Sequence, residues 1–410
     1  MVVDVATEDD VLWTVRYCIH NSIPFLAQNG GNAWSTTFHL PRQTSAFIGR
    51  ISPNDTYSAV VNTTASNSTN ILTAQLPSSI LINLRNLNNI SFSLPPVITT
   101  YNTTSTNATV TIGGGVLISD LVTAAHAHSV QIQTGNCNCV GMLGALLGGG
   151  YSRFQGLYGL GVDNILSVNM ITAAGELLTI GAKEEEEEGS IQGKSKNDAD
   201  TGTDDDTTAK EDLWWAIRGA GPNFGIITSA TLKAYPMPDK SKSGAWLATL
   251  LFDESKLEQL VSAMEALDLG AHMAIFLYFF APLPDCTPSI VAELFYANTD
   301  ALTARAAFRS IYDVGGWRED AASTGFKEYD KVNEGSEMFC AKDGARKPTY
   351  GAGLAHVSPV AMRAIWEEYK AFLKVGGMGR RKVRCWWRNI PWTPSCACPM
   401  QRRPIRGGAG

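Results

Sequence analysis

The sequence lacks the features of several common classes of protein. No apolar run reaches the roughly 20 residues that span a bilayer, and the opening MVVDVATEDD is too acidic and too poor in apolar residues for a secretory signal. Residues 183–212 hold 12 acids and 4 bases, a balance of −8 within a net charge of −6, so the rest of the chain sums to +2. Since no basic, aromatic-rich face emerges, we expect neither a membrane nor a nucleic-acid partner.

Motifs for metals and for nicotinamide dinucleotides are also missing. The eight cysteines include no C-x₂-C pair, and the two C-x-C pairs have poor spacing for tetrahedral zinc. His126 and His128 lie two apart at the end of an expected helix, so they point to different faces and cannot share a metal. Gly219 and Gly221 are followed by Phe224 where a third glycine belongs, and a strand follows where a helix should. These spacings predict neither a metal site nor a Rossmann fingerprint.

Glycine is abundant in one apolar stretch, Thr134–Asp163, where nine of 30 residues are glycine. Apolar side chains run through the stretch, so it does not have the composition of a linker. Many glycines among apolar side chains indicate a backbone that packs closely against something bulky and flat. Together with Cys137, a thiol that could act as a nucleophile, the stretch points to a large cofactor.

A strand that leads into a Gly-Gly turn lies near the N-terminus. A T-x-x-D capping box predicts a helix from about Glu8 to Asn21. The short strand Ile23–Ala27 follows and ends in Q-N-G-G-N, where Gly30 and Gly31 expose N–H groups that could hold phosphate. The alternative is a plain β-turn.

Further elements are expected before residue 238. The pattern predicts a helix over Ile118–Ala127, two strands within Ile165–Ile180, a short helix Asp212–Arg218 and a strand Ile226–Ala234. Residues 183–211 are of low complexity and strongly acidic. We expect them to form a disordered surface loop, since nothing in them can build a core.

Longer alternating units begin at about Asp239. Strands are expected at Ser243–Phe252, Met273–Ala281 and Ser289–Ala297, and helices at Asp253–Leu267, at Asp300–Asp313 and from Pro359 to about Leu373. An antiparallel sheet covered by helices on one side is the natural α+β arrangement. After Gly376 the chain is rich in arginine and tryptophan without periodicity, and we expect it not to fold. A basic arm for nucleic acid is the alternative there.

Four motifs, taken in order, resemble one family. Q-N-G-G-N, T-G-N-C-N-C-V-G, L-G-G-G-Y-S-R-F-Q-G-L-Y-G-L-G-V-D-N-I and D-L-W-W-A-I-R-G-A-G-P-N-F-G-I-I-T resemble the flavin-linked oxidases of the berberine-bridge-enzyme-like group, particularly fungal members. These share the PCMH-type FAD-binding domain of the vanillyl-alcohol-oxidase superfamily. The resemblance is strong over Val2–Pro236 and only general over the next 140 residues or so.

The resemblance implies an α+β fold of three parts. The FAD-binding domain, made of two α+β subdomains, is expected at 1–238 with the acidic insertion 183–211. The substrate domain, an antiparallel sheet covered by helices, is expected at 239–375, and an irregular basic tail at 376–410.

The resemblance also assigns residues to the cofactor, FAD. These are Gly30, Gly31, Asn32, Cys137, Val140, Gly141, Gly144, Gly148, Gly149, Gly150, Asp163, Gly225, Ile226 and Ile227. Asn32 stands where the family has a histidine bonded to the flavin, and an amide is no nucleophile. Cys137 is in register for the family's second link, three residues before Val140, and Cys139 is not. We therefore predict at most one covalent link, through Cys137. FAD held without a covalent bond is the alternative.

The implied reaction is a two-electron oxidation of a small molecule, an alcohol or a secondary metabolite, by an FAD-dependent oxidoreductase. A base takes a substrate proton, hydride moves to flavin N5 and O2 reoxidises the flavin. Family members often use a tyrosine or carboxylate of the substrate-domain sheet as the base. Tyr278 and Tyr296 are the residues we expect, although a strand tyrosine is more often part of a core.

Two further expectations concern the cellular route and the ends of the chain. Six N-x-[ST] sequons favour a glycosylated secretory protein; they are at Asn54, Asn62, Asn67, Asn89, Asn102 and Asn107. Family members normally begin upstream with a signal peptide and end with a segment that returns to the flavin domain. A rival interpretation is therefore a catalytically impaired flavin-binding remnant from a truncated gene model.

Overall fold

The computed structural model describes residues 1–32, 79–94, 108–182, 204–237, 239–281, 287–335, 340, 356–375 and 385–387. The chain divides into two units. Unit 1 consists of Met1–Tyr151 and Tyr158–Pro238, and unit 2 consists of Ser152–Leu157 and Asp239–Gly410. No helix within the described ranges is both long enough and apolar enough to cross a membrane.

Unit 1 begins with a small parallel sheet and a capped helix. The strands β1 (Val2–Asp4), β3 (Ile80–Asn83) and β2 (Phe25–Gln28) pair in that order. Helix α1 (Glu8–His20) starts at the predicted capping box, in which Thr7 and Asp10 bond each other's backbone. Its apolar face is buried in one cluster with these strands and with side chains of the neighbouring sheet, which joins the two halves of the unit.

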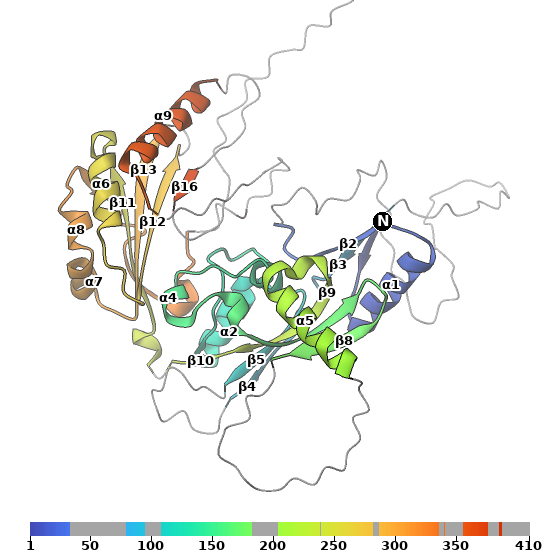
Figure 1. Cartoon of the computed structure of the whole chain (residues 1–410). Helices are drawn as coiled ribbons and strands as arrows, with labels where there is room; N and C mark the ends of the chain where they lie inside the picture. The colour runs from blue at the N-terminus through green and yellow to red at the C-terminus, as the bar shows by residue number, and fades with distance from the viewer. Residues whose placement is uncertain are drawn as a thin grey trace, which may run out of the picture. The chain divides into compact units, whose positions relative to one another are not determined.

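The larger sheet of unit 1 is antiparallel, in the order β4-β5-β9-β7-β8 (Figure 1). The strands are β4 (Ile90–Ser93), β5 (Thr109–Gly113), β7 (Ile165–Thr172), β8 (Leu177–Gly181) and β9 (Gly225–Lys233), and β6 (Val130–Gln131) pairs separately with β10 (Tyr235–Pro236). Helix α2 (Ile118–Ala127) has the predicted bounds. The short helices α3 (Met142–Leu146) and α4 (Gln155–Tyr158) lie in the glycine-rich stretch. Both predicted strands on either side of Gly175 are confirmed.

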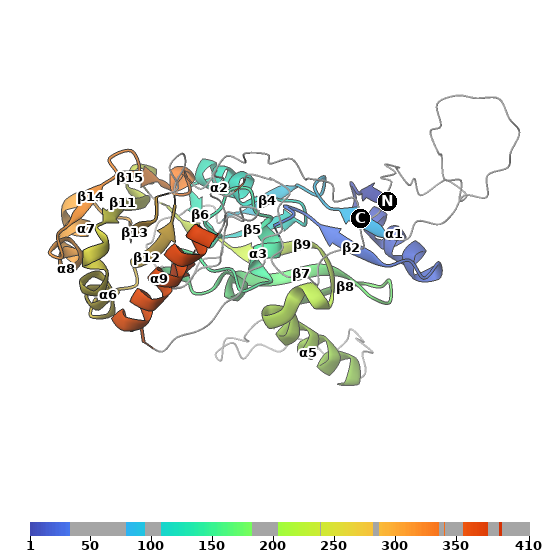
Figure 2. The same ribbon diagram turned by 90° about the horizontal axis from the view of Figure 1, so that it is seen from above.

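Helix α5 corrects the prediction for the acidic segment. It runs from Asp204 to Ala220, so it begins eight residues before the predicted Asp212, within the stretch expected to be disordered. Three aspartates at its start suit the positive end of a helix dipole, and the T-T-A-K-E run that follows contains good helix formers. The helix packs beside β8 (Figure 2). Residues 183–203 lie outside the described residues.

Unit 2 is an antiparallel sheet in the order β14-β11-β13-β12-β16, with β15 also paired to β11. The strands are β11 (Gly244–Phe252), β12 (Met273–Phe280), β13 (Ser289–Ala297), β14 (Trp317–Glu319), β15 (Gly325–Glu328) and β16 (Cys385–Trp387). Helices α6 (Leu257–Glu265), α7 (Ala301–Ala307), α8 (Arg309–Tyr312) and α9 (Pro359–Val375) gather on one face of the sheet (Figure 1). The predicted α+β class is confirmed.

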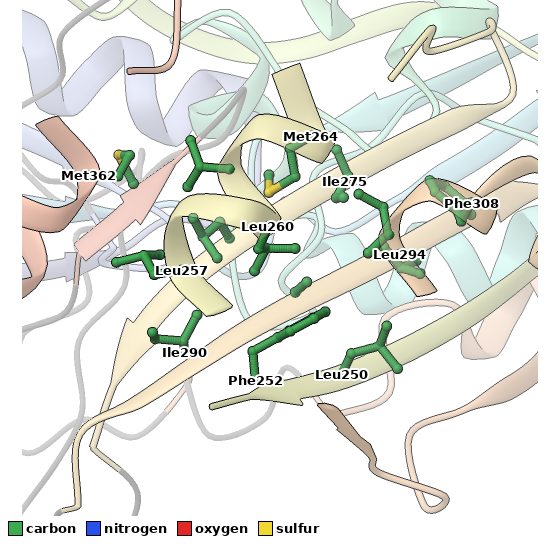
Figure 3. Close-up of a cluster of buried hydrophobic side chains, with 14 of the residues drawn as sticks. Leu250, Phe252, Leu257, Leu260, Met264, Ile275, Ile290, Leu294, Phe308 and Met362 are labelled. Atoms are coloured by element: carbon green, nitrogen blue, oxygen red, sulfur yellow. The ribbon is translucent and has the colours of Figure 1, made fainter. Parts of the chain in front are cut away.

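The core of unit 2 lies between that face and the helices. Alternate residues of β13, namely Ile290, Ala292 and Leu294, are buried against α6, where Leu260 and Met264 face them (Figure 3). The residues between them therefore point to the opposite face of the sheet. This alternation decides which strand residues can belong to a site.

The basic tail also requires a correction. Cys385–Trp387, within a segment expected not to fold, pairs antiparallel with β12 and extends the sheet. The edge of a strand offers unpaired N–H and C=O groups, and aromatic residues favour the extended conformation, so three residues suffice without periodicity. The other residues after 375 lie outside the described part of the chain.

Candidate functional site

Two glycine-containing segments that are distant in the sequence meet in unit 1. A Cβ on Gly30 would lie 2.6 Å from the Gly141 nitrogen and 2.9 Å from the Cys139 carbonyl oxygen. Both atoms belong to backbone that cannot rotate away, so no side chain fits there. Gly31 has a φ of 71°, in the left-handed region that favours glycine. The turn and the cysteine segment therefore form one glycine-lined backbone surface.

Two asparagine side chains hold this surface together. Asn32 Nδ2 donates to the Cys139 carbonyl at 3.1 Å and to a carbonyl of its own turn at 3.2 Å. Asn29 Nδ2 donates to the Val116 carbonyl at 3.0 Å, and it fills the space where Gly141 lacks a side chain. Asn29 was not predicted from the sequence. Its signal is its place directly before the Gly-Gly pair.

The loop of residues 137–141 is fixed to the start of α2. Ile118 N donates to the Val140 carbonyl at 3.0 Å, and Ser119 N donates to the Asn138 carbonyl at 3.1 Å. These are N–H groups that a helix leaves without intrahelical partners, and the loop satisfies them. Within the loop, Val140 N donates to the Cys137 carbonyl at 3.2 Å, which closes a turn. Cys137 is therefore tied to the start of α2 through the backbone bonds of its own turn and of Asn138.

The two cysteines of the C-N-C motif are in different chemical states. Cys137 keeps its thiol and is half-buried, whereas Cys139 is disulfide-bonded, as is Cys340. A sulfur in a disulfide is not a thiolate nucleophile. Of this pair, Cys137 is the one that can attack a cofactor, in agreement with its register. The covalent link itself stays a prediction.

The glycines of the Thr134–Asp163 stretch serve two different purposes. A Cβ on Gly150 would lie 2.7 Å from Gly161 Cα, and Gly161 N donates to the Gly150 carbonyl at 2.8 Å. Val162 N donates to the Gly149 carbonyl at 3.2 Å. These glycines permit close contact between two protein segments. A Cβ on Gly144, by contrast, would meet nothing within 4 Å, so this position has room for a ligand.

Gly225, Ile226 and Ile227 open the central strand β9. The ladder with β5 reaches only as far as Gly113 opposite Ser229, so these three residues pair in the ladder with β7 alone. The side chains of Ile226 and Ile227 are buried. The contact of their main chain with the cofactor, which the resemblance implies, stays a prediction.

Asp163 lies at the surface of unit 1 in an ion pair. Its Oδ1 accepts a hydrogen bond from Arg218 Nη2 at 2.7 Å, and both side chains are more than a third exposed. Solvent screening limits such a pair to at most about 1 kcal/mol. Its predicted place near the adenine end of FAD stays a prediction.

A half-buried pair of tyrosines fixes the segment after the glycine run. Tyr158 stacks on Tyr235 with ring centroids 3.9 Å apart, and its hydroxyl donates to Gln131 Oε1 at 2.6 Å. The Tyr235 hydroxyl donates to Asn164 Oδ1 at 2.6 Å. Burial, with the Tyr235 phenol beside it, raises the pKa of Tyr158, and burial also raises the pKa of Tyr235. Both phenols therefore stay neutral and act as structural donors.

The two tyrosines predicted as bases lie on opposite faces of the sheet in unit 2. Tyr296 packs against the hydrophobic core, where its ring stacks on that of His272 at 6.0 Å. Tyr278 lies on the other face, stacked on Phe276 at 6.0 Å, and its hydroxyl donates to Glu293 Oε2 at 3.4 Å. Only Tyr278 is on the face without the covering helices.

An ion pair beside Tyr278 was not predicted from the sequence. Arg153 Nη2 donates to Glu293 Oε1, and the two side chains are 11% and 18% exposed. Arg153 Nη1 also donates to the Val332 carbonyl at 3.2 Å. The signal was present, because a glutamate in the apolar strand S-I-V-A-E-L-F-Y-A needs a charged partner.

Comparison with known proteins relates the chain to flavoproteins. The family described as "FAD binding domain" matches residues 57–181. An FAD-linked oxidoreductase of Pyricularia oryzae is 27% identical over 380 residues, which cover 92% of this chain and 60% of that protein. One of Emericella nidulans is 31% identical over 277 residues, 66% of this chain and 42% of that protein. The matched parts of the chain thus cover about two fifths to three fifths of the length of these relatives.

A solved structure shows the fold. The glucooligosaccharide oxidase of Acremonium strictum matches with a TM-score of 0.57 over 89% of this chain and 62% of that one, at 13% identity. In unit 1, Gly144 has open space beside its backbone that admits a flat group and so fits FAD, whereas Gly30 and Gly141 are packed against protein. FAD is the cofactor of this domain, as predicted.

Proposed function

We propose, from the premise that this chain is a relative of fungal FAD-linked oxidoreductases, that it takes part in the FAD-dependent oxidation of a small molecule. The substrate is an alcohol or an intermediate of secondary metabolism. FAD when bound accepts hydride at N5 and returns the electrons to O2. The residues of the chain bind the cofactor and move the substrate proton.

The observation that carries the proposal is the joined backbone surface of unit 1. Gly30 can approach Cys139 and Gly141 only because it has no side chain. That contact places the Gly-Gly turn against the loop of residues 137–141, which contains the thiol Cys137. Backbone N–H groups suit the pyrophosphate of FAD, and a thiol suits a bond to its ring.

Cys137 provides the single covalent link in this proposal. In the Acremonium strictum oxidase, FAD carries both a 6-S-cysteinyl and an 8α-N1-histidyl link. Here Asn32 stands at the expected place of the histidine, and Cys139 is engaged in a disulfide. One link is therefore the maximum that these positions can supply.

Acid precipitation of the purified yellow protein tests the link. Part of the flavin should stay with the pellet of the wild type, and all of it should appear in the supernatant of Cys137→Ala. The Cys18→Ala variant is the matched control, because Cys18 is a buried thiol of α1. Complete release from the wild type would reject the link, whereas a colourless protein would favour the remnant interpretation.

Tyr278 is the preferred base. Its hydroxyl already donates to a carboxylate, Glu293, whose other oxygen is held by Arg153. A carboxylate beside a phenol can accept the hydroxyl proton of the phenol while the phenol oxygen takes a proton from the substrate. Tyr296 is the weaker alternative, since its ring packs against a core.

Anaerobic flavin reduction measures the base directly. Screening alcohols for H2O2 release first identifies a substrate. Tyr278→Phe should then slow flavin reduction by roughly 10²-fold or more, while Tyr296→Phe leaves it within a few-fold. Equal rates in Tyr278→Phe and the wild type would exclude Tyr278 as the base.

The secretory pathway is the proposed route. Of the six sequons, Asn89 lies within the described residues, and it is exposed just before β4, as is Ser91 two residues later. An exposed Asn-x-Ser at the end of a loop is accessible to glycosylation. Peptide mapping after glycosidase treatment of protein from a fungal host should find Asn89 converted to aspartate.

A further inference from the structure

We infer that Asn32 is a positioning residue, whose side-chain amide holds the loop of residues 137–141 against the Gly30–Gly31 turn. By holding this loop, Asn32 fixes the position of the Cys137 thiol at the proposed FAD site. This inference rests on the proposed function, which gives the thiol its role. It assigns Asn32 to the protein rather than to the phosphates of FAD.

The hydrogen bonds of Asn32 are directed into the protein. An amide NH2 group has two donor hydrogens. Asn32 Nδ2 donates to the Cys139 carbonyl at 3.1 Å and to the Gly30 carbonyl at 3.2 Å. Both donors are therefore used, and the side chain joins two segments that are 107 residues apart in the sequence.

The loop is held from two directions. On one side, N–H groups at the start of α2 bond to the carbonyls of Asn138 and Val140. On the other side, the loop contacts the turn so closely that Gly30 tolerates no Cβ. Asn32 adds the polar bond to this second contact. Loss of that bond should let the loop move away from the turn and carry Cys137 with it.

Aspartate in place of Asn32 gives the sharpest test. It has nearly the same shape, but its carboxylate has no donor hydrogen and would face the Cys139 carbonyl oxygen. Asn32→Ala removes the bond without adding charge. Asn21→Asp is the matched control, because Asn21 Nδ2 donates to the Tyr17 carbonyl at 2.8 Å at the end of α1.

Hydrogen exchange of the full FAD-loaded chain measures the position of the loop. Peptides that cover residues 136–142 should exchange roughly five- to tenfold faster in Asn32→Asp and Asn32→Ala than in the wild type. Asn21→Asp should leave them unchanged. The visible circular dichroism of the bound flavin should also change in the Asn32 variants and not in the control, at a comparable melting temperature. A variant that is only less stable would have a lower melting temperature without the change in the circular dichroism of the flavin.

Two outcomes would overturn the inference. Unchanged exchange of residues 136–142 in both Asn32 variants would show that the amide does not hold the loop. Weaker FAD binding with unchanged exchange would assign Asn32 directly to the cofactor. If acid releases all flavin from the wild type, the covalent link of the proposed function fails, and the exchange data still decide whether Asn32 holds the loop.

Discussion

Gly30 and Gly144 lack a side chain for different physical reasons. At Gly30 a Cβ would collide with protein backbone at 2.6 Å, whereas at Gly144 it would meet nothing within 4 Å. The first glycine is needed for the protein to fold around the site. The second is needed only if something else occupies the adjacent space. The two positions can therefore separate folding from cofactor binding.

Gly144→Ala is expected to weaken FAD binding by about tenfold or more. The free energy of unfolding of the apoprotein should stay unchanged or rise by up to about 1 kcal/mol, since alanine favours the helix α3. Gly30→Ala should destabilise the apoprotein itself by about 1–3 kcal/mol. Urea denaturation and a fluorescence titration with FAD measure the two effects. Gly219→Ala, with equally open space, is the control. Unchanged FAD affinity in Gly144→Ala would place the cofactor elsewhere.

Single residues differ in how far the sequence determines their role. Spacing from Val140 selected Cys137, and the disulfide state of Cys139 supports the choice. The disulfide itself could not be predicted, because pairing depends on distances between residues far apart in the sequence. The same limit hid Arg153, whose partner Glu293 is 140 residues away. Local spacing identifies chemistry, whereas partners need the fold.

At the scale of elements, the sequence predicted bounds well where a cap or a strict period exists. Helices α1 and α2 and the strands β11, β12 and β13 begin and end within one or two residues of expectation, whereas the short strands β14, β15 and β16 were not predicted. The helix expected over Asp300–Asp313 is instead divided at Phe308 into α7 and α8. Phe308 is fully buried, so packing decides a break that periodicity cannot reveal.

The helices α6 and α9 are joined by a charge network that should depend on pH. Arg363 Nε and Nη2 donate to the two oxygens of Glu258 at 2.6 and 2.7 Å. These bonds lower the pKa of Glu258 to about 2 from the ordinary 4.5. Because the folded pKa is depressed, the stabilisation is complete above about pH 4.5 and is lost as the pH falls toward 2.

Glu258→Gln should therefore reduce the free energy of unfolding by at most about 1 kcal/mol at pH 6, since Glu258 is 44% exposed and solvent screens the pair. The difference from the wild type should shrink as the pH falls from 4.5 to about 2. Urea denaturation at pH 6, 4, 3 and 2 measures this difference. Glu368→Gln, on the same helix pair with an exposed carboxylate, is the control. A difference that persists at pH 2 would contradict the assignment.

At the scale of the whole molecule, the chain crosses between its two units more often than the sequence suggested. Ser152–Leu157 lies inside the glycine-rich stretch assigned to the FAD-binding domain, yet it groups with unit 2. Phe154 packs edge-on against Phe295 at 5.0 Å, and Gly156 is in close contact with the carbonyl of Ala271. The segment that follows the Gly148–Gly150 run is thus built into unit 2.

The ion pair of Arg153 and Glu293 should be the strongest single attachment of that segment. Both side chains are largely buried, so removing one partner leaves a buried charge unpaired. Arg153→Met is expected to destabilise unit 2 by about 3–5 kcal/mol, and Glu293→Leu by a similar amount. The double variant Arg153→Met, Glu293→Leu should recover most of the loss. Urea denaturation, with hydrogen exchange of β13 as a local measure, completes the cycle. If the losses in the free energy of unfolding add up in the double variant, the two side chains act independently. The segment would then be held by its aromatic contacts instead.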